Sequence, residues 1–113
     1  MTDCLFCKIA AKEIPADFVL ETDNVVAFRD IAPQSPTHVI VIPREHFDNA
    51  AELANGNKQL AAEVLQATID VATLEGLAEG YRIVTNIGAD GGQSVGHVHF
   101  HVLGGRSLNW PPG

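Results

Sequence analysis

The chain has 113 residues, of which 46% are hydrophobic and 19% are charged, and its formal net charge is −7. This length predicts a single domain, residues 1–113, because two domains of that total length would each bury too little apolar surface to be stable. The negative charge argues against duplex nucleic acid as a partner, since that binding depends on Lys and Arg side chains. A single mononucleotide remains compatible, because backbone amides and imidazoles can hold one phosphate in a protein of any net charge.

The sequence shows neither a signal-peptide pattern nor a run of about 18 apolar residues that could span a membrane. We therefore expect a cytoplasmic protein that does not associate with membranes. Its two cysteines, Cys4 and Cys7, are so close in sequence that a disulfide between them would close a very short, strained loop. The two cysteines could therefore bind a metal, take part in redox chemistry or have no special role.

A short helix and three strands are predicted in the first part of the chain. Residues 4–13 place apolar side chains on one helical face, and Pro15 disfavours continuation of that helix. Two β-prone runs, residues 18–20 and 25–28, flank a polar turn and predict a hairpin. Residues 38–42 predict a third strand.

One long helix is predicted over residues 57–77, where apolar residues recur at the spacing of a helical face. A strand over 81–85, a glycine-containing loop over 86–96 and a final strand over 97–103 follow. This order lacks the regular alternation of strand and helix that builds a parallel sheet. The predicted fold class is therefore α+β, with a mostly antiparallel five-stranded sheet, one long helix and one short helix.

Three histidines, His97, His99 and His101, alternate with apolar residues in the final predicted strand. Successive side chains of a strand point to opposite faces, so the three imidazoles share one face at a spacing of about 7 Å. Three titratable rings are poor core material, because each needs a hydrogen-bond partner when it is buried. The row therefore indicates a functional site more strongly than a single histidine would.

The same strand resembles the His-φ-His-φ-His-φ-φ signature of the histidine triad (HIT) family, in which φ is a hydrophobic residue. Further segments resemble the Hint branch of that family, and they extend along nearly the whole chain. They are Phe6-x-Lys8-Ile9, Glu13-Ile14-Pro15, Asp30-Ile31-x-Pro33, Pro36-Thr37-His38, Ile42-Pro43, Gly91-Gly92-Gln93-Ser94 and Trp110-Pro111-Pro112-Gly113. The resemblance implies a HIT-like fold, hydrolysis of purine nucleoside phosphoramidates, and a homodimer with a sheet that continues across both subunits.

The resemblance also implies the roles of three histidines in catalysis. The ring of His99 is expected to attack the α-phosphorus and expel an amine, leaving a nucleotidyl-histidine that water hydrolyses. Neutral imidazole suits this role, because its unperturbed pKa of about 6.5 leaves most of it uncharged at neutral pH. His101 is expected to hold a phosphate oxygen. His38 is expected to orient the cluster or to relay a proton to the leaving group, with a purely structural role as the alternative.

A set of nucleotide-binding residues follows from the resemblance as well. The carboxylate of Asp30 would accept hydrogen bonds from the ribose hydroxyls, apolar residues would pack on the purine base, and the glycine-rich loop would surround the phosphate. The expected set is Leu5, Phe6, Ile9, Phe28, Asp30, Ile31, Asn86, Gly92, Gln93, Ser94, His99 and His101. Without the resemblance, the loop would be a wide hairpin loop and the apolar residues ordinary core, since no P-loop pattern is present.

The C-x2-C spacing of Cys4 and Cys7 supplies half of the four ligands that a tetrahedral zinc site needs. His46 and His97 are the candidates for the other two, because the phosphorus chemistry requires neither of them. We therefore expect one structural zinc per chain and no organic cofactor. A redox pair is a weaker interpretation because no strand precedes Cys4, and unliganded thiols stay open as an alternative.

Two other classes of function remain open at the level of sequence. The histidines of the row could themselves hold a catalytic zinc, which would make the protein a metallohydrolase that a strong chelator inactivates. The protein could also bind nucleotides as a scaffold without catalysis. Replacement of His99 by Asn separates the scaffold from the enzyme, because only an enzyme would lose turnover.

Overall fold

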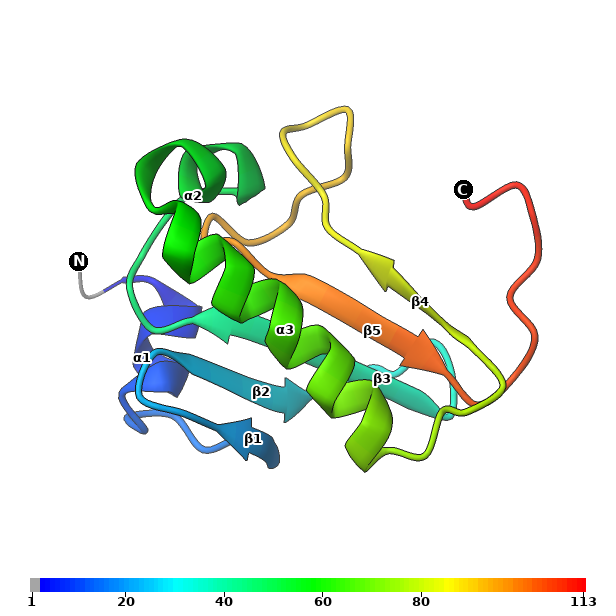
Figure 1. Ribbon diagram of the computed structural model, residues 1–113. Helices are drawn as coiled ribbons and strands as arrows, with labels where there is room; N and C mark the ends of the chain where they lie inside the picture. The colour runs from blue at the N-terminus through cyan, green and yellow to red at the C-terminus, as the bar shows by residue number, and fades with distance from the viewer. Residues whose placement is uncertain (1–2) are drawn as a thin grey trace.

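The computed structural model describes residues 3–113, which form three helices and five strands (Figure 1). In chain order they are α1 (Leu5–Ala10), β1 (Phe18–Glu21), β2 (Val25–Arg29), β3 (Thr37–Pro43), α2 (Ala50–Gly56), α3 (Lys58–Leu74), β4 (Tyr81–Val84) and β5 (Phe100–Gly104). None of the helices in this part of the chain has the length and apolar character needed to cross a membrane.

The five strands form one sheet in the order β1-β2-β3-β5-β4, and every neighbouring pair is antiparallel. In the two central strands β2 and β3 the side chains are buried on both faces of the sheet. Residues 25–28 of β2 and 39–42 of β3 are accordingly continuous runs of apolar residues, most of them β-branched, rather than an alternation of polar and apolar ones. Each face must therefore be covered by another element.

The long helix α3 runs diagonally across one face of the sheet (Figure 1). Its buried side chains include Leu60, Val64 and Val71, which pack with Val39 of β3 and Val102 of β5. An apolar side chain of this size gains about 1.5–3 kcal/mol when it is fully buried. This layer is the larger of the two cores and contains no histidine.

The short helix α1 covers part of the opposite face. Phe6 and Ile9 pack there against Phe28 and Ile40 of the sheet, and the rings of Phe6 and Phe28 meet edge to face with 5.6 Å between centroids. This second core is small, and the remainder of the face carries the histidines. The division of the sheet into one apolar face and one mixed face thus places the functional residues beside α1.

The α+β class and the five-stranded antiparallel sheet agree with the prediction from sequence, but there are three helices instead of one long and one short helix, and the predicted helices 4–13 and 57–77 are shorter, at 5–10 and 58–74. A separate helix, α2, precedes α3; it was not predicted because it buries only one residue, Leu53, which gives almost no periodic signal. The side chains of Asn49 and Asn57 accept hydrogen bonds at the starts of α2 and α3, which separates the helices. In addition, β5 begins at Phe100 instead of His97, because residues 97–99 lack ladder pairing.

Candidate functional site

Three histidines meet on the mixed face of the sheet. His38 in β3 and His101 in β5 lie on adjacent strands, with 2.8 Å between Nε2 of His38 and Nδ1 of His101. The ring of His99 lies 5.1 Å from that of His101, centroid to centroid. The two rings are therefore closer together than the backbone spacing of about 7 Å between alternate residues of a strand.

Fixed backbone groups determine which nitrogen of His38 carries the proton. The backbone N–H of Gln34 donates to Nδ1 of His38 at 3.0 Å, and a peptide N–H can only donate. The neutral ring of His38 must then be protonated at Nε2, which donates to Nδ1 of His101. Because Nδ1 of His101 accepts this hydrogen bond, the neutral ring of His101 carries its own proton on Nε2. His101 therefore presents an N–H donor, as its expected role of holding a phosphate oxygen requires.

The same reasoning gives the opposite result for His99. Its Nδ1 lies 2.8 Å from the carbonyl oxygen of His97, which can only accept, so the proton sits on Nδ1. The lone pair of Nε2 is left free, as a nucleophile requires. The edge of the Phe6 ring lies against the imidazole at 5.1 Å, and the hydroxyl of Thr85 donates to the carbonyl oxygen of His99 at 2.8 Å. His99 is 4% exposed, so both its ring and its backbone are fixed.

Burial keeps the imidazoles of His38 and His101 neutral. It lowers the pKa of His101 to about 4, an effect that the neighbouring rings of His99 and His38 increase and the carboxylate of Asp30 opposes. Burial also lowers the pKa of His38, again against the opposing effect of Asp30. These directions agree with the assigned protons. This arrangement favours the orienting role expected of His38 over the proton relay, since giving up its Nε2 proton would leave an imidazolate.

A cavity of about 630 Å³ opens in front of His99 and His101. Most of its wall is apolar, and it contains nine of the residues expected to bind a nucleotide. These are Leu5, Phe6, Ile9, Phe28, Asp30, Ile31, Ser94, His99 and His101. Five apolar or small residues outside the expected nucleotide-binding set also line it, namely Ile14, Pro15, Ala16, Ile40 and Val95.

Asp30 lies between the cavity and the histidines. Its Oδ1 accepts a hydrogen bond from the backbone N–H of Ala32 at 2.8 Å, and its Oδ2 lies 3.4 Å from Nε2 of His38. The first contact fixes the carboxylate at the turn after β2, where it stays partly accessible. The carboxylate is thus available to accept hydrogen bonds from hydroxyl groups in the cavity.

Three residues of the expected nucleotide-binding set do not line this cavity. Asn86 follows the edge strand β4, which β5 separates from the cavity-lining strands β2 and β3. Gly92 is at an exposed turn with a φ of 80°, where its lack of a side chain permits the left-handed backbone. The side-chain amide of Gln93 is turned toward backbone groups of Gly88, Asp48 and Val95.

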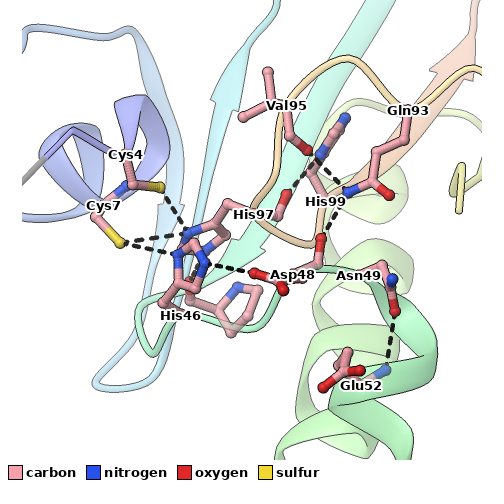
Figure 2. Close-up of polar contacts among 11 residues, drawn as sticks. Cys4, Cys7, His46, Asp48, Asn49, Glu52, Gln93, Val95, His97 and His99 are labelled. Carbon is pink, nitrogen blue, oxygen red and sulfur yellow. Dashed lines mark hydrogen bonds and ion pairs between the residues drawn. The ribbon is translucent and has the colours of Figure 1, made fainter. Parts of the chain in front are cut away.

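A second cluster combines Cys4, Cys7, His46 and His97, whose potential ligand atoms all lie within 4.8 Å of one another (Figure 2). Nδ1 of His97 lies 3.3 Å from the sulfur of Cys4, and Nδ1 of His46 lies 3.4 Å from the sulfur of Cys7. The two cysteines sit at the start of α1, with Cys4 as its N-cap. The structure therefore brings together the four residues expected to bind zinc.

The outer hydrogen bonds of this cluster direct both imidazole lone pairs toward the thiols. Nε2 of the fully buried His97 donates to the carbonyl oxygen of Pro43 at 2.9 Å, and Nε2 of His46 donates to Oδ1 of Asp48 at 3.0 Å. Each Nδ1 is then unprotonated and free to bind a metal, an arrangement typical of zinc-binding histidines. With two sulfur and two nitrogen donors, the residues fit a tetrahedral zinc ion.

The surroundings of Cys7 do not favour the redox interpretation of the cysteine pair. Reactive thiols in C-x2-C motifs have a lowered pKa, because positive charge or a helix N-terminus stabilises the thiolate. Here burial and the adjacent Cys4 thiol raise the pKa of Cys7 to about 11. The thiol is therefore a poor nucleophile on its own.

Comparison with known proteins agrees with this geometry. Residues 11–108 match the profile of the HIT domain. The chain belongs to the HIT family. It is 50% identical over 111 residues to an uncharacterised HIT-like protein of Synechococcus elongatus, a match that covers 98% of this chain and 97% of that one.

Two further relatives of this HIT protein have names that state a type of enzyme. Adenylylsulfatase HINT1 of Arabidopsis thaliana is 47% identical over 111 residues, which cover 96% of this chain and 76% of the relative. The crystal structure of a HIT family hydrolase from Legionella pneumophila superposes with a TM-score of 0.94 at 48% identity, covering 98% of this chain and 100% of that one. The fold of this HIT protein is thus that of solved HIT family hydrolases.

Sequence reasoning missed the groups that orient the histidines of this HIT protein. The backbone of Gln34 and the carbonyl of Pro43 carry no sequence signal, because any residue supplies a peptide group. The sequence weakly indicated a role for Asp48, since an acidic residue two positions after a candidate zinc ligand can accept a hydrogen bond from that ligand. It indicated none for Thr85, because the hydroxyl of Thr85 contacts a backbone oxygen fourteen residues away.

Proposed function

We propose that this HIT protein hydrolyses purine nucleoside phosphoramidates, or related nucleotidyl conjugates, through a covalent nucleotidyl-histidine intermediate on His99. One observation carries the proposal: the free Nε2 lone pair of His99 and the Nε2–H donor of His101 are neighbours at the wall of one cavity. A nucleophile and a donor for the phosphoryl oxygen are the two groups that such a displacement needs first.

In the first step, Nε2 of neutral His99 attacks the α-phosphorus and the bond from phosphorus to the leaving nitrogen breaks. The amine departs with the bonding electrons and takes a proton from water. Nδ1 of His99 keeps its proton and donates it to the carbonyl oxygen of His97, and this hydrogen bond stabilises the positive ring that forms. The N–H of His101 donates to a phosphoryl oxygen as charge develops there.

In the second step, water attacks the phosphorus, the bond to Nε2 of His99 breaks, and the proton that this water releases neutralises the hydroxide formed when the amine was protonated. The products are the nucleoside monophosphate and the original neutral imidazole. The apolar walls of the cavity suit a purine base, and Asp30 would accept hydrogen bonds from the ribose. The Arabidopsis relative is named an adenylylsulfatase, which supports including nucleotidyl conjugates whose leaving group is not an amine.

Intact-mass analysis after brief exposure to adenosine phosphoramidate tests the proposal. A nucleotidyl adduct should appear on the wild-type chain and map to His99 by peptide analysis. His99→Asn should bind AMP and show no adduct. An adduct on another residue, or turnover in His99→Asn that equals wild type, would overturn the assignment. Turnover that persists with AMP bound but without any adduct would point to direct attack by water.

A metallohydrolase built on the catalytic histidines is less consistent with the same geometry. Nε2 of His38 carries a proton that the Gln34 backbone contact holds in place, so this nitrogen has no lone pair for a metal. His97 is also not available to bind a metal together with His99 and His101, because its Nδ1 faces the cysteines. The histidines therefore support a protein nucleophile better than a catalytic metal.

We further propose that Cys4, Cys7, His46 and His97 hold one structural zinc. The ion would supply no chemistry to the displacement. It would tie the start of α1 to residue 97, which is next to the catalytic segment. The donor set and the outer hydrogen bonds support this proposal, as set out above.

We also propose that the protein is a homodimer. Leu65 and Ile69 are exposed on the outer side of α3, and Tyr81 is exposed on the edge strand β4, whose backbone could pair with a second copy. The C-terminal segment with the exposed Trp110 would then lie near the partner subunit. Sedimentation at micromolar concentration should give about twice the 12.1 kDa chain mass, and a monomer would contradict the proposal.

A further inference from the structure

The segment from His46 to Asp48 links the cysteine-histidine cluster to the segment before β5. His46 belongs to the cluster itself. The carbonyl oxygen of Phe47 accepts from the backbone N–H of Val98 at 2.7 Å, and the carbonyl oxygen of Asp48 accepts from Nε2 of Gln93 at 2.6 Å. Three consecutive residues therefore each make one connection, and the last one reaches the glycine-rich loop (Figure 2).

Gln93 uses its whole amide to hold that loop. Its Nε2 donates to the carbonyl oxygens of Asp48 and Val95, and its Oε1 accepts from the backbone N–H of Gly88 at 3.0 Å. The backbone N–H of Gln93 also donates to the carbonyl oxygen of Gly88, which closes the loop over residues 88–93. With both amide protons engaged, the side chain has no donor left for a ligand. Its effect falls on its neighbours Ser94 and Val95, which line the cavity.

The cluster also reaches the nucleophile directly. His97 places its Nδ1 among the cysteines and its carbonyl oxygen on Nδ1 of His99. The cavity wall formed by Ser94, Val95 and His99 is thus connected to the cluster by two routes, one through Gln93 and one through His97. A metal ion that fixes the cluster would hold in place the same wall that a nucleotide in the cavity would contact.

From this geometry we infer that Gln93 is a positioning residue that couples the cysteine-histidine cluster to the nucleotide cavity, so that zinc and nucleotide bind cooperatively. The inference rests on the proposed function and on the proposed zinc. Two ligands that order one exposed loop share its entropic cost, and each then raises the affinity of the other by the same factor. Gln93 therefore acts on the nucleotide through the loop and the metal cluster, without touching the nucleotide.

The coupling is measured as the ratio of zinc affinities with and without saturating AMP, determined by competition with a chromophoric chelator. We expect AMP to raise zinc affinity about tenfold in wild type, within the usual range of such coupling. Gln93→Glu should reduce that ratio at least threefold, because a carboxylate cannot donate to the carbonyls of Asp48 and Val95. Gln59→Glu makes the same chemical change at an exposed position of α3 and should keep the wild-type ratio.

AMP affinity distinguishes positioning from direct contact. Positioning predicts that Gln93→Glu weakens AMP binding in the zinc-loaded protein and leaves it unchanged in the zinc-free protein. Equal weakening in both forms would show that Gln93 acts on the nucleotide independently of the cluster and would overturn the inference. A lower melting temperature with an unchanged ratio would show a merely structural role and would overturn it as well.

Other outcomes separate this inference from the proposals beneath it. If Gln93→Glu does not fold, Gln93→Met removes the donors without adding charge and should give the same reduced ratio. A wild-type ratio of one, with normal binding of both ligands, overturns the inference alone. A wild type that does not bind AMP overturns the proposed function, and one that does not bind zinc overturns the zinc proposal; the inference falls with either.

Discussion

All five histidines of the chain belong to two neighbouring clusters, and the hydrogen bonds around the clusters differ in direction. In the cluster with the cysteines, each imidazole donates its proton outward to an oxygen, so the lone pairs of His46 and His97 converge. In the cluster of His38, His99 and His101, His99 donates outward, but His38 accepts from a backbone N–H and donates its own N–H inward to His101. The first arrangement suits a cation, and the second presents one lone pair and one proton to a cavity.

The comparison shows that residue type alone does not assign a role to a histidine. The group bonded to one ring nitrogen decides what the other nitrogen can do. A backbone carbonyl oxygen accepts from one ring nitrogen of His97 and of His99, so the other nitrogen of each ring has a free lone pair. The backbone N–H of Gln34 instead donates to Nδ1 of His38, so Nε2 of that ring is a hydrogen-bond donor. The same side chain can therefore serve a metal, a phosphorus atom or another histidine within one site.

The largest expected effect comes from removing one imidazole from each cluster. His101→Ala deletes the donor to the phosphoryl oxygen and should slow formation of the nucleotidyl adduct by about 10²–10³-fold. His46→Ala should lose most of the zinc and slow the same step less than tenfold at saturating substrate. Rapid-quench measurement of adduct formation, with metal analysis of each variant, checks both. If adduct formation slowed by a similar factor in both variants, the two clusters would not differ in function as proposed.

Loss of the metal should be the next largest effect, and it should appear in stability. At free zinc a hundredfold above the Kd, binding adds about 2.7 kcal/mol to the free energy of unfolding, which corresponds to a Tm change of roughly 10 °C or more. Cys4→Ser/Cys7→Ser should show that loss, and a chelator should lower the Tm of wild type but not of the double variant. Zinc content that is equal in both proteins would leave the cysteines as ordinary packing residues.

The cluster of His38, His99 and His101 should make stability depend on pH between about 6.5 and 4. Because burial lowers the pKa of His101 to about 4 in the folded protein, the unfolded chain binds more protons throughout this window. The stabilisation is complete above pH 6.5 and is lost as the pH falls. For His101 alone the loss from pH 7 to pH 5 is about 2 kcal/mol. Urea denaturation at both pH values should show a smaller pH effect in His101→Ala; an equal one would contradict the assigned burial.

The smallest expected effect lies outside both clusters and serves as their reference. The guanidinium of Arg29 contacts Glu75 at 2.8 and 2.9 Å and holds the pKa of that carboxyl below its usual range. Because Arg29 is 43% exposed, Glu75→Gln should cost only about 1 kcal/mol of stability at pH 7. This contribution is present above the unfolded carboxyl pKa and is lost only as the pH falls below it.

The two pH windows can be separated by denaturation of matched variants. Glu75→Gln should leave the change in stability between pH 7 and pH 5 nearly as in wild type, and differ from wild type less at pH 3 than at pH 7. Glu79→Gln, an exposed position, is the control and should follow wild type throughout. A loss of the pH 7 to 5 change in Glu75→Gln would assign that window to the ion pair instead of the histidines.

The sequence was sufficient for features that depend on local repetition or on short motifs. The antiparallel α+β sheet followed from the order of the elements, and the placement of His99 and His101 opposite the α3 core followed from the alternation of side chains. The pairing of Cys4 and Cys7 with two histidines followed from ligand types and number. The helix α2 was not predicted because a single buried leucine produces no periodic pattern of apolar residues. The start of β5 was predicted too early because the position of the paired neighbouring strand decides where a strand begins.

The sequence by itself determined which side chains this HIT protein has available and on which face of the sheet they lie, because those properties depend on neighbours along the chain. Only the tertiary structure decided how each one is used. The proton on His38 depends on a turn that folds back onto its ring, and the lone pair of His97 depends on a carbonyl fifty-four residues away. Gln93, expected at the nucleotide, instead bonds to a carbonyl forty-five residues away. Peptide groups are the same at every position, so only the folded backbone determines which of them a side chain meets.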